Sequence, residues 1–529
     1  MPQGDPSGTK PAAPYDVIII GSGAGGATLA YSLRDCGKRV LVVERGEHLP
    51  LEPQNSDSTA VFKQRRYHTT ERWRNVLSGR AIAPKEFYWV GGKTKVYGAT
   101  LIRLREADFG ELEHREGISP AWPITYDDLE PYYAFAEQLY LVHGQAGRDP
   151  VEPRRTTDYP FPALPESAYI QDLFKQLEHQ GLKPFALPLG IDYRPGGPCT
   201  YCRTCDGYPC HVHAKSDAEL RCLRPALQSG NVDLMTGAKA LKLHTNSQGT
   251  VESVEIEKDN IHQRLFADVF VVACGAIQSA ALLLKSKSDL HPRGLGNSSG
   301  MVGCNLMFHN ATGLVGIHPL RRNTARFQKS LCLSDFYLRG PDWPYPMGVI
   351  QLLGFYPLQH NGVPLIGRFI NERSIQFFAL SEDLPEPFNR VELCDDAAVG
   401  IRYRPNNLLT HRKLVSLARR AFRQAGYPVV ASQFVLQPKD AGAHECGTIR
   451  FGKDPNDSVL DADCRSHDVP NLYVVDASFF PSSGAVNPAL TVIAQALRVG
   501  EHLGGMRITS SAAAIGYPAA MLAEPKGKP

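Results

Sequence analysis

Near its start, the chain has a pattern of apolar and polar positions that predicts a strand, a turn, a helix and a second strand. Residues 17–20 form a continuous apolar run, 21–26 are rich in glycine, and 27–33 are mostly apolar. A second apolar run, 40–43, follows a short polar connection. Continuous apolar runs are typical of strands buried on both faces of a parallel sheet. The chain is therefore expected to begin with a β–α–β unit.

Further along, the pattern predicts more strands and helices. Apolar and β-branched runs separated by turn residues predict strands at 232–235, 240–244, 251–257 and 266–272. We expect these strands to form a small inserted sheet, after which a helix at 277–285 returns the chain to the first unit. Residues 313–435 favour an antiparallel sheet covered by helices, one of them at 412–424. The last predicted elements are a buried strand and an apolar helix, at 471–475 and 488–503.

The glycines of the first turn have the spacing of a dinucleotide-binding motif. Gly21 would make the tight turn, Gly23 would admit a pyrophosphate, and Gly26 would let helix and strand pack closely. Glu44 ends the second strand, close to the roughly twenty-residue offset at which an acid binds a ribose diol. A carboxylate repels a 2′-phosphate, so Glu44 favours an unphosphorylated adenosine ribose, although Arg45 follows it directly.

A second glycine-rich segment, 89–99, follows a long polar stretch. Its glycines either let the backbone approach a flat or charged ligand or simply make turns. The preceding residues, 47–84, are rich in Arg and Thr, so we expect them to lie outside the core.

Composition favours a globular protein with more than one domain. The chain has 529 residues, of which 43% are hydrophobic and 21% charged, so we expect two or three domains. A formal net charge of +3 gives no reason to expect nucleic acid or an anionic membrane as partner. Residues 1–14 lack the apolar stretch of a signal peptide, and no run of about eighteen apolar residues predicts a membrane span. A cytoplasmic protein without membrane insertion is expected.

The chain has twelve cysteines, which should stay reduced in that compartment. Four of them form a cluster in which the spacing resembles that of metal-binding thiolates. Such a cluster would hold an iron–sulfur centre, or zinc with help from His211 and His213. The alternative is a reduced, packed loop, and no firm metal site is assigned. The clustered cysteines are Cys199, Cys202, Cys205 and Cys210.

Together, the motifs resemble the glucose–methanol–choline (GMC) oxidoreductase family over nearly the whole chain. The matching stretches, in family order, are 21–26 with Glu44, 91–98, 275–286, 444–450 and 476–488. The resemblance implies an α/β fold, with a Rossmann-like FAD-binding domain built from discontinuous segments and an α+β substrate domain with an antiparallel sheet. The implied domains are 14–108, 214–312 and 440–506 for FAD, 109–213 and 313–439 for substrate, and flexible tails at 1–13 and 507–529.

The resemblance also implies which residues contact the cofactor and substrate. His444 matches the family's catalytic histidine, and Asn487 matches a second catalytic position that holds histidine or asparagine in relatives. Relatives with covalent FAD have a histidine at the position of Val96, so FAD is expected to bind non-covalently here. The second glycine segment departs from the family, with Lys93 among residues that replace the usual serines and asparagine. The implied cofactor-binding residues are Gly21, Gly23, Gly26, Glu44, Arg45, Gly91, Gly92, Thr94, Gly98, Ala273, Gly275, Asp476, Asn487 and Pro488.

The expected reaction removes hydride from the CH–OH group of a small-molecule alcohol or sugar. A neutral alcohol is a poor hydride donor, so a base within hydrogen-bond reach must take the hydroxyl proton. Imidazole titrates in a suitable range, which favours His444, and the Asn487 amide would share the developing charge. The hydride would go to flavin N5, and oxygen or another electron acceptor would reoxidise the flavin.

Other functions remain open at this stage. The same fold includes a lyase and a light-driven decarboxylase, and an iron–sulfur centre in 199–210 would pass electrons to a protein partner. The first motif alone would fit an NAD-dependent enzyme, which leaves the segment around His444 unexplained. Residues between 327 and 378 are expected to line the substrate site. Aromatic residues there either stack on a sugar or pack in the core, namely Phe336, Tyr337, Trp343 and Tyr345.

Overall fold

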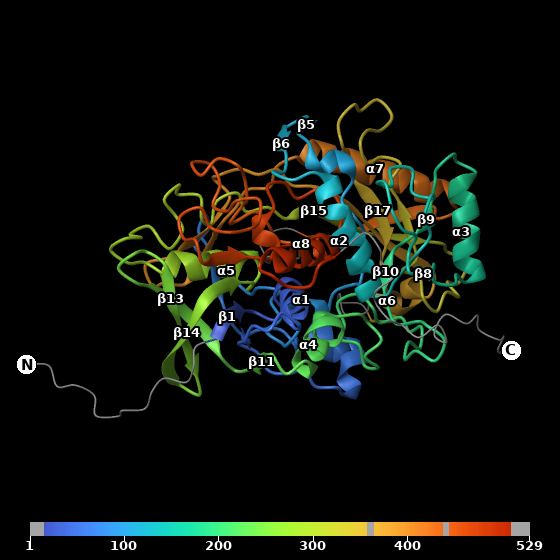
Figure 1. Ribbon diagram of the computed structural model, residues 1–529. Helices are drawn as coiled ribbons and strands as arrows, with labels where there is room; N and C mark the ends of the chain where they lie inside the picture. The colour runs from blue at the N-terminus through green and yellow to red at the C-terminus, as the bar shows by residue number, and fades with distance from the viewer. Residues whose placement is uncertain (1–14, 357–363, 437–443, 509–529) are drawn as a thin grey trace, which may run out of the picture.

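A seven-stranded sheet contains the predicted amino-terminal β–α–β unit (Figure 1). The structure is a computed structural model that describes residues 15–356, 364–436 and 444–508. The parallel part of the sheet has the order β11-β2-β1-β14-β22, and β1, β2 and β22 have the buried apolar runs expected of parallel strands. These strands are β1 (Tyr15–Ile20), β2 (Val40–Val43), β11 (Val232–Met235), β14 (Ile261–Val272) and β22 (Leu472–Val474).

Strand β14 joins the parallel sheet to an antiparallel meander. The first half of this 12-residue strand pairs antiparallel with β13 (Val251–Lys258), which pairs in turn with β12 (Lys239–Thr245). The second half lies between β1 and β22. The expected separate small sheet is therefore wrong in one respect, because β11 pairs with β2 at the edge of the parallel sheet. Strand partners are set by tertiary packing, which the local pattern of 232–235 does not encode.

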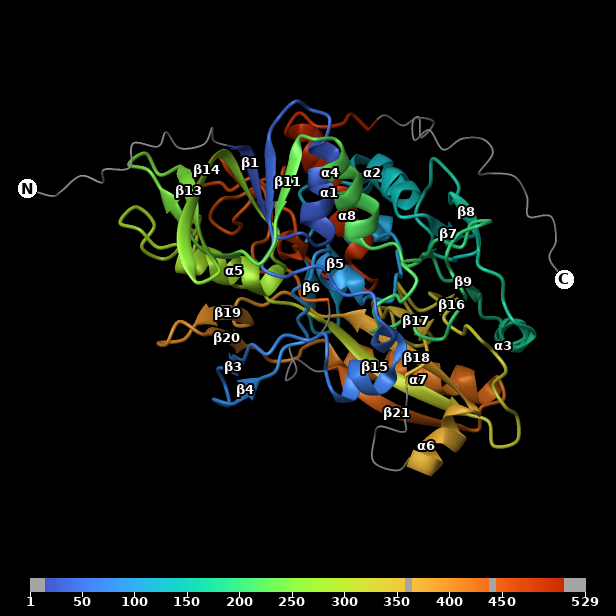
Figure 2. The same cartoon turned by 90° about the horizontal axis from the view of Figure 1, so that it is seen from below.

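Helices far apart in the sequence cover the parallel sheet together (Figures 1 and 2). Helix α1 (Ala24–Leu33) packs against α8 (Ala489–His502), and α8 packs against α2 (Tyr126–Leu139). The close approach of α1 and α8 requires Gly500, where a Cβ atom would lie 2.4 Å from Ser32 Oγ. Helix α5 (Ala276–Lys285) follows β14 and packs against β12. The carboxyl-terminal helix thus becomes part of the amino-terminal unit.

A six-stranded antiparallel sheet forms a second layer, with the order β21-β15-β18-β17-β16-β9. Helix α7 (Leu408–Gln424) packs on it, and the rings of Phe377 and Phe422 stack with their centroids 3.6 Å apart. The predicted α/β fold class with an antiparallel second sheet is confirmed. The strands are β9 (Phe185–Ala186), β15 (His309–Ile317), β16 (Leu331–Leu333), β17 (Val349–Leu352), β18 (Ser374–Glu382) and β21 (Val429–Leu436).

The polar stretch 47–84 lies partly inside the protein, contrary to expectation. Tyr67, Trp73 and Ile82 are each 2% exposed, and Trp73 belongs to a four-stranded sheet with the order β19-β20-β3-β4. A few apolar residues in a mostly polar segment are enough to anchor that segment against a larger core. The remaining elements are β3 (Trp73–Asn75), β4 (Ala81–Ile82), β5 (Leu112–His114), β6 (Gly117–Ser119), β7 (Val142–Gly144), β8 (Phe161–Pro162), β10 (Leu189–Gly190), β19 (Arg390–Leu393), β20 (Val399–Arg402), α3 (Ala168–Glu178), α4 (Arg224–Gln228) and α6 (Pro364–Asn371).

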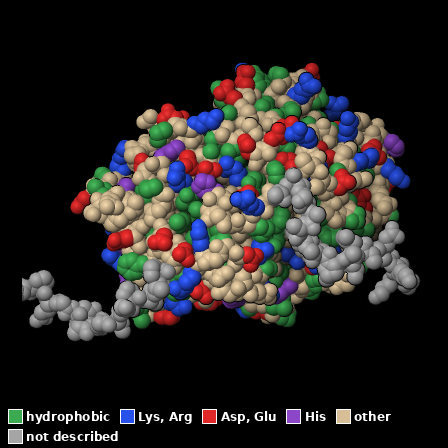
Figure 3. Space-filling view, viewed as in Figure 1, with side chains coloured by type: hydrophobic (Ala, Val, Ile, Leu, Met, Phe, Trp, Pro, Cys, Tyr) green, Lys and Arg blue, Asp and Glu red, His purple; other side chains and the backbone are tan. Residues whose placement is uncertain are grey.

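Charges of both signs are interspersed on the face seen in Figure 3. Within the part of the chain that the structure describes, no helix is both long enough and apolar enough to cross a bilayer. The predicted tails, 1–13 and 507–529, lie outside the described residues except for 507–508. The proposed domain boundaries stay a prediction.

Candidate active site

A cavity of about 650 Å³ lies at the carboxyl ends of the parallel strands. Ile20 ends β1, Val43 ends β2 and Ala273 follows β14, and all three line it. Ligands of parallel α/β sheets bind at this edge. Most of the predicted site residues line the same cavity, namely Gly21, Gly23, Glu44, Arg45, Gly92, Thr94, Gly98, Ala273, Gly275, His444, Asp476, Asn487 and Pro488.

The first glycine turn leaves room for a phosphate group. A Cβ atom on Gly21 would lie 2.3 Å from the carbonyl oxygen of Ala273, and one on Gly26 would lie 2.0 Å from that of Gly21. Both glycines are therefore required by backbone packing, and Gly26 does not border the cavity. A Cβ on Gly23 would meet nothing within 4 Å and would project into open space beside the uncapped amino end of α1. Free N–H groups at a helix start suit an anion.

Glu44 is held rigidly at the end of β2. Its Oε2 accepts hydrogen bonds from the backbone N–H (3.0 Å) and the hydroxyl (2.6 Å) of Ser22, and its Oε1 accepts one from the Gly46 N–H (2.9 Å). Burial raises the pKa of Glu44, against which these hydrogen bonds act. The Ser22 hydroxyl also accepts from the Gly91 N–H at 3.1 Å, which joins the two glycine segments. Gly91 serves this contact and does not border the cavity.

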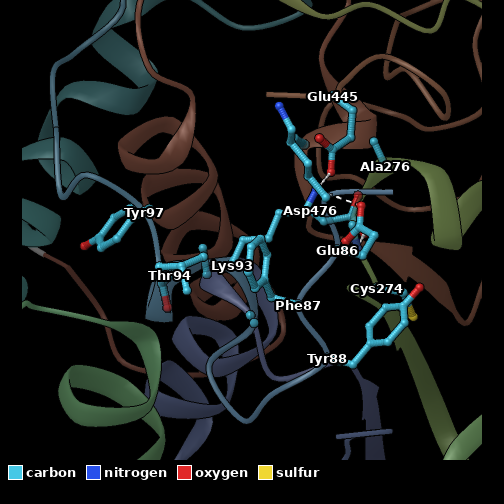
Figure 4. Close-up of a pocket in the computed structure, with 18 of the residues that line it drawn as sticks. Glu86, Phe87, Tyr88, Lys93, Thr94, Tyr97, Cys274, Ala276, Glu445 and Asp476 are labelled. Atoms are coloured by element: carbon cyan, nitrogen blue, oxygen red, sulfur yellow. Dashed lines mark hydrogen bonds and ion pairs between the residues drawn. The ribbon is translucent and has the colours of Figure 1, made fainter. Parts of the chain in front are cut away.

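Lys93 lies between two carboxylates on one wall of the cavity (Figure 4). Its Nζ is 2.7 Å from Glu86 Oε1 and also binds Glu445 Oε1. Burial alone would lower the pKa of Lys93, but Glu445 and Glu86 raise it. Burial raises the pKa of Glu86 to about 7, and Lys93 opposes that shift. Glu445 Oε2 is buried and has no hydrogen-bond partner among the described residues, so the wall retains an acceptor.

His444 and Asn487 come together although 43 positions separate them in the chain. The Asn487 Nδ2 lies 3.5 Å from His444 Nε2, and the Asn487 Oδ1 accepts a hydrogen bond from Gln351 Nε2 at 3.0 Å. Both residues line the cavity, and both are the side chains that the sequence motifs predicted to react. Gln351 was not predicted, because it lies in the ordinary apolar pattern of strand β17.

His309 was also missed by the sequence motifs, and its hydrogen bond to His444 favours one tautomer of that ring. Its Nε2 lies 2.9 Å from the carbonyl oxygen of Gly484, which can only accept, so this nitrogen carries the hydrogen. Burial lowers the pKa of His309, so the ring is neutral and its Nδ1 is an acceptor. The Nδ1 atoms of His309 and His444 are 2.9 Å apart, so the hydrogen between them belongs to His444. The Nε2 of His444 is therefore left unprotonated.

The charge state of His444 follows from its surroundings. Burial lowers the pKa of His444 well below its ordinary value, and the neighbouring His309, Lys93 and Lys329 shift the pKa in the same direction. A neutral imidazole with a bare Nε2 can accept a proton. The arrangement can therefore act as a general base toward a hydroxyl group in the cavity.

The four clustered cysteines do not form a metal site in this structure. Within the described ranges, no group of three or more His, Cys, Asp or Glu residues is placed to hold a metal ion. The Cys210 sulfur instead accepts hydrogen bonds from the N–H groups of Ala214 (3.2 Å) and Lys215 (3.4 Å). The Lys215 ammonium donates to the carbonyl oxygens of Tyr97, Cys205 and Tyr208 at 2.7–2.8 Å. The loop is therefore fastened by a buried lysine to the second glycine segment.

The region between 327 and 378, which is predicted to line the substrate site, contributes several residues to the cavity. Lys329, Leu353, Gly354, Tyr356 and Phe378 border the cavity. The four aromatic residues singled out from the sequence do not border it, namely Phe336, Tyr337, Trp343 and Tyr345.

Comparisons with known proteins identify the family of this chain. GMC oxidoreductase family models match residues 15–311 and 385–496. The 6'''-hydroxyparomomycin C oxidase of Streptomyces lividus is 34% identical, over 93% of this chain and 92% of that protein. The paromamine 6'-oxidase of Streptomyces fradiae is 32% identical, over 93% and 91%. The crystal structure of pyridoxine 4-oxidase from Mesorbium loti has a TM-score of 0.64 at 21% identity, over 92% of this chain and 99% of that one, and shows the shared fold.

Proposed function

This chain belongs to the GMC oxidoreductase family and acts on CH–OH groups, and we propose that His444 is the base and Asn487 the orienting group of its reaction. The substrate would be a small alcohol or a sugar. His444 Nε2 would take the hydroxyl proton while the carbon loses hydride, so that the C–OH group becomes a carbonyl. FAD, the cofactor that the family implies, accepts hydride at flavin N5 when bound.

The observation that carries this proposal is the direction of the hydrogen bonds around His444. The Gly484 carbonyl holds the hydrogen of His309 on Nε2, and His309 holds the hydrogen of His444 on Nδ1. The bare Nε2 of His444 is then the basic atom on the cavity side. A base whose lone pair already faces the substrate site can accept the proton without first changing tautomer, so no free energy is spent on that change.

Asn487 would bind the substrate oxygen as its negative charge develops. Its Oδ1 is engaged by Gln351, so its Nδ2 hydrogens face His444 Nε2. A substrate hydroxyl seated between these two groups would donate to His444 and accept from Asn487. A fixed neutral dipole stabilises a developing oxyanion without reorganising.

Several residues fit the FAD that the family implies. The open space beside Gly23 and the free N–H groups of α1 suit the pyrophosphate, and Glu44 retains acceptor capacity for a ribose. Asp476 Oδ2 accepts from the Gly275 N–H at 2.9 Å and fastens the α5 turn beside the cavity. The side chain at position 96 is a valine, which offers no nucleophile for a covalent bond. Non-covalent FAD is therefore part of the proposal.

The test is anaerobic flavin reduction, followed by absorbance. The purified protein would be mixed with a panel containing primary alcohols, 2-methyl-1,2-propanediol, neutral hexopyranosides and paromamine. We expect at least one of them to bleach the flavin. His444→Ala should keep FAD but reduce it at a rate lowered by roughly 100-fold or more, as general-base catalysis contributes roughly 10²–10⁴-fold.

Two outcomes would contradict the proposal. The exposed His262→Ala variant should behave as wild type. If His444→Ala reduced the flavin as fast as this control, another group would be the base. If no alcohol or sugar bleached the wild-type flavin, a non-redox reaction of the lyase or decarboxylase type would be favoured. Release of the flavin on acid precipitation tests non-covalent binding.

A further inference from the structure

An ion pair between Asp206 and Lys329 lies on the wall of the same cavity. Lys329 Nζ donates to Asp206 Oδ1 at 2.6 Å, and Asp206 Oδ2 accepts from the Gly354 N–H at 2.5 Å. A Cβ atom on Gly98 would meet Asp206 Oδ1 at 1.8 Å and Lys329 Nζ at 2.5 Å. The pair therefore packs directly on the backbone of the second glycine segment. Neither side chain is explained by the proposed proton transfer.

Lys329 has unused hydrogen-bonding capacity in a buried position. Its side chain is 3% exposed, and its ammonium group has three N–H donors, of which Asp206 takes one. In the described part of the chain, its Nζ makes no other hydrogen bond that the geometry supports. A buried ammonium with unpaired donors is costly unless a ligand supplies acceptors. The Asp206 carboxylate likewise retains lone pairs after binding Lys329 and Gly354.

One short stretch of chain connects the pair to the reacting groups, because the Gly354 N–H binds Asp206 and Gln351, three residues earlier, binds Asn487. The charge of Lys329 is one of those that lower the pKa of His444. On the same cavity wall, the rings of Phe62 and Tyr356 have their centroids 4.9 Å apart. The cavity therefore combines aromatic surface with a donor–acceptor pair beside the proposed base. A few fixed polar groups on an apolar wall are typical of a small-molecule site with a defined orientation.

We propose that Asp206 and Lys329 form a substrate subsite that binds the ring hydroxyl groups of a neutral saccharide unit next to the carbon that is oxidised. This inference rests on the function proposed above and names its substrate class. A hydroxyl group can accept from the Lys329 ammonium and donate to the Asp206 carboxylate at once. The pair has no net charge, so it gives no net Coulombic preference for a charged unit over a neutral one. The Phe62 and Tyr356 rings would pack against the C–H face of the sugar ring.

The subsite also gives the cysteine-rich loop a structural purpose. Asp206 follows Cys205 in that loop, and Lys215 fastens the backbone of Cys205 and Tyr208 to that of Tyr97. A loop held at these points keeps Asp206 in place over the glycine segment. The cysteine-rich loop would then support substrate binding through packing.

The experiment compares two primary alcohols on a six-membered ring, one with ring hydroxyls and one without. Methyl α-D-glucopyranoside and cyclohexylmethanol would each be mixed anaerobically with the holoenzyme, and kcat/KM for flavin reduction would be measured. We expect wild type to favour the glucoside. Lys329→Met also removes a charge that acts on His444, and that effect is common to both substrates. Beyond it, the variant should lower kcat/KM for the glucoside by roughly 10- to 100-fold relative to kcat/KM for cyclohexylmethanol, the range for a hydrogen bond to a charged group.

Further variants keep the result interpretable. The double variant Asp206→Asn with Lys329→Met removes both charges, so it leaves no buried charge unpaired, and it should show the same selective loss. Lys453→Met removes an exposed lysine and should leave kcat/KM for both substrates unchanged. The subsite is refuted if wild type has the higher kcat/KM for cyclohexylmethanol. It is also refuted if the variants lower kcat/KM equally for both substrates, or for neither. If no alcohol reduces the wild-type flavin, the proposed function itself fails, which is a different outcome.

Discussion

Replacing His309 tests the hydrogen-bond chain behind the proposed base. His309 does not border the cavity, so it acts only through His444, whose Nδ1 lies 2.9 Å from its own Nδ1. His309→Leu removes the acceptor. His309→Asn places an amide oxygen near the position of Nδ1, so it restores an acceptor that cannot take up a proton in this pH range. The two variants therefore separate loss of the acceptor from loss of the imidazole.

The magnitude follows from the hydrogen left without a partner. In His309→Leu, the productive tautomer of His444 has a buried and unpaired Nδ1–H group, which costs about 1–3 kcal/mol. The other tautomer avoids this cost by carrying the hydrogen on Nε2, where it can no longer act as a base. The basic form is then depleted by roughly 5- to 150-fold. Flavin reduction at saturating alcohol should slow by this factor, with little change in KM, since His309 does not touch substrate.

The assay is stopped-flow flavin reduction under anaerobic conditions, with flavin content and unfolding midpoint measured for each variant. His309→Asn should retain the wild-type rate within about 10-fold, because one neutral hydrogen bond of altered geometry changes the free energy by about 0.5–1.5 kcal/mol. Wild-type speed in a correctly folded His309→Leu variant would refute the proposed direction of the chain. Equal losses in both variants would show that an acceptor at this position is not sufficient.

Four further outcomes are expected. Gly23→Val should abolish FAD retention while the apoprotein stays folded, because its side chain would enter open space in the cavity; unchanged flavin content at equal protein would contradict this. Flavin reduction should stay constant through neutral pH and fall only well below about 6.5, because the pKa of His444 is lowered by burial and neighbouring charges. The free energy of unfolding should also decrease as pH falls below about 6.5, because His444 then binds a proton more readily in the unfolded chain than in the folded one. Stopped-flow rates and denaturant unfolding curves measured over the same pH range check the two expectations. Phe422→Ala should destabilise the protein by about 3–5 kcal/mol through loss of its stack on Phe377, measured by chemical denaturation.

The local pattern predicted the elements that depend on short-range rules. Strands β1 and β2, helix α1 and the glycine turn follow from apolar runs and glycine spacing, and the structure has them where the pattern placed them. His444 and Asn487 were found through motifs, and their roles stay a prediction. The edge strand β11 was assigned to the wrong group, since its pairing with β2 depends on contacts across 192 positions, as between Val40 and Val232.

By itself, the sequence determined the family, the nucleotide-binding turn and the chemical types available for proton transfer, because turn geometry and strand burial depend on neighbouring residues. Only the tertiary structure decided which side chains meet at the cavity. His309, Gln351 and Lys329 lie in stretches with no motif, and Asp206 lies in the cysteine cluster, where nothing in the spacing pointed to its carboxylate. All four reach the site through strand pairing and loop packing over more than a hundred residues. A hydrogen bond between distant side chains leaves no periodic signal in the chain, so its direction and the charge state that it imposes appear only once the fold brings the atoms together.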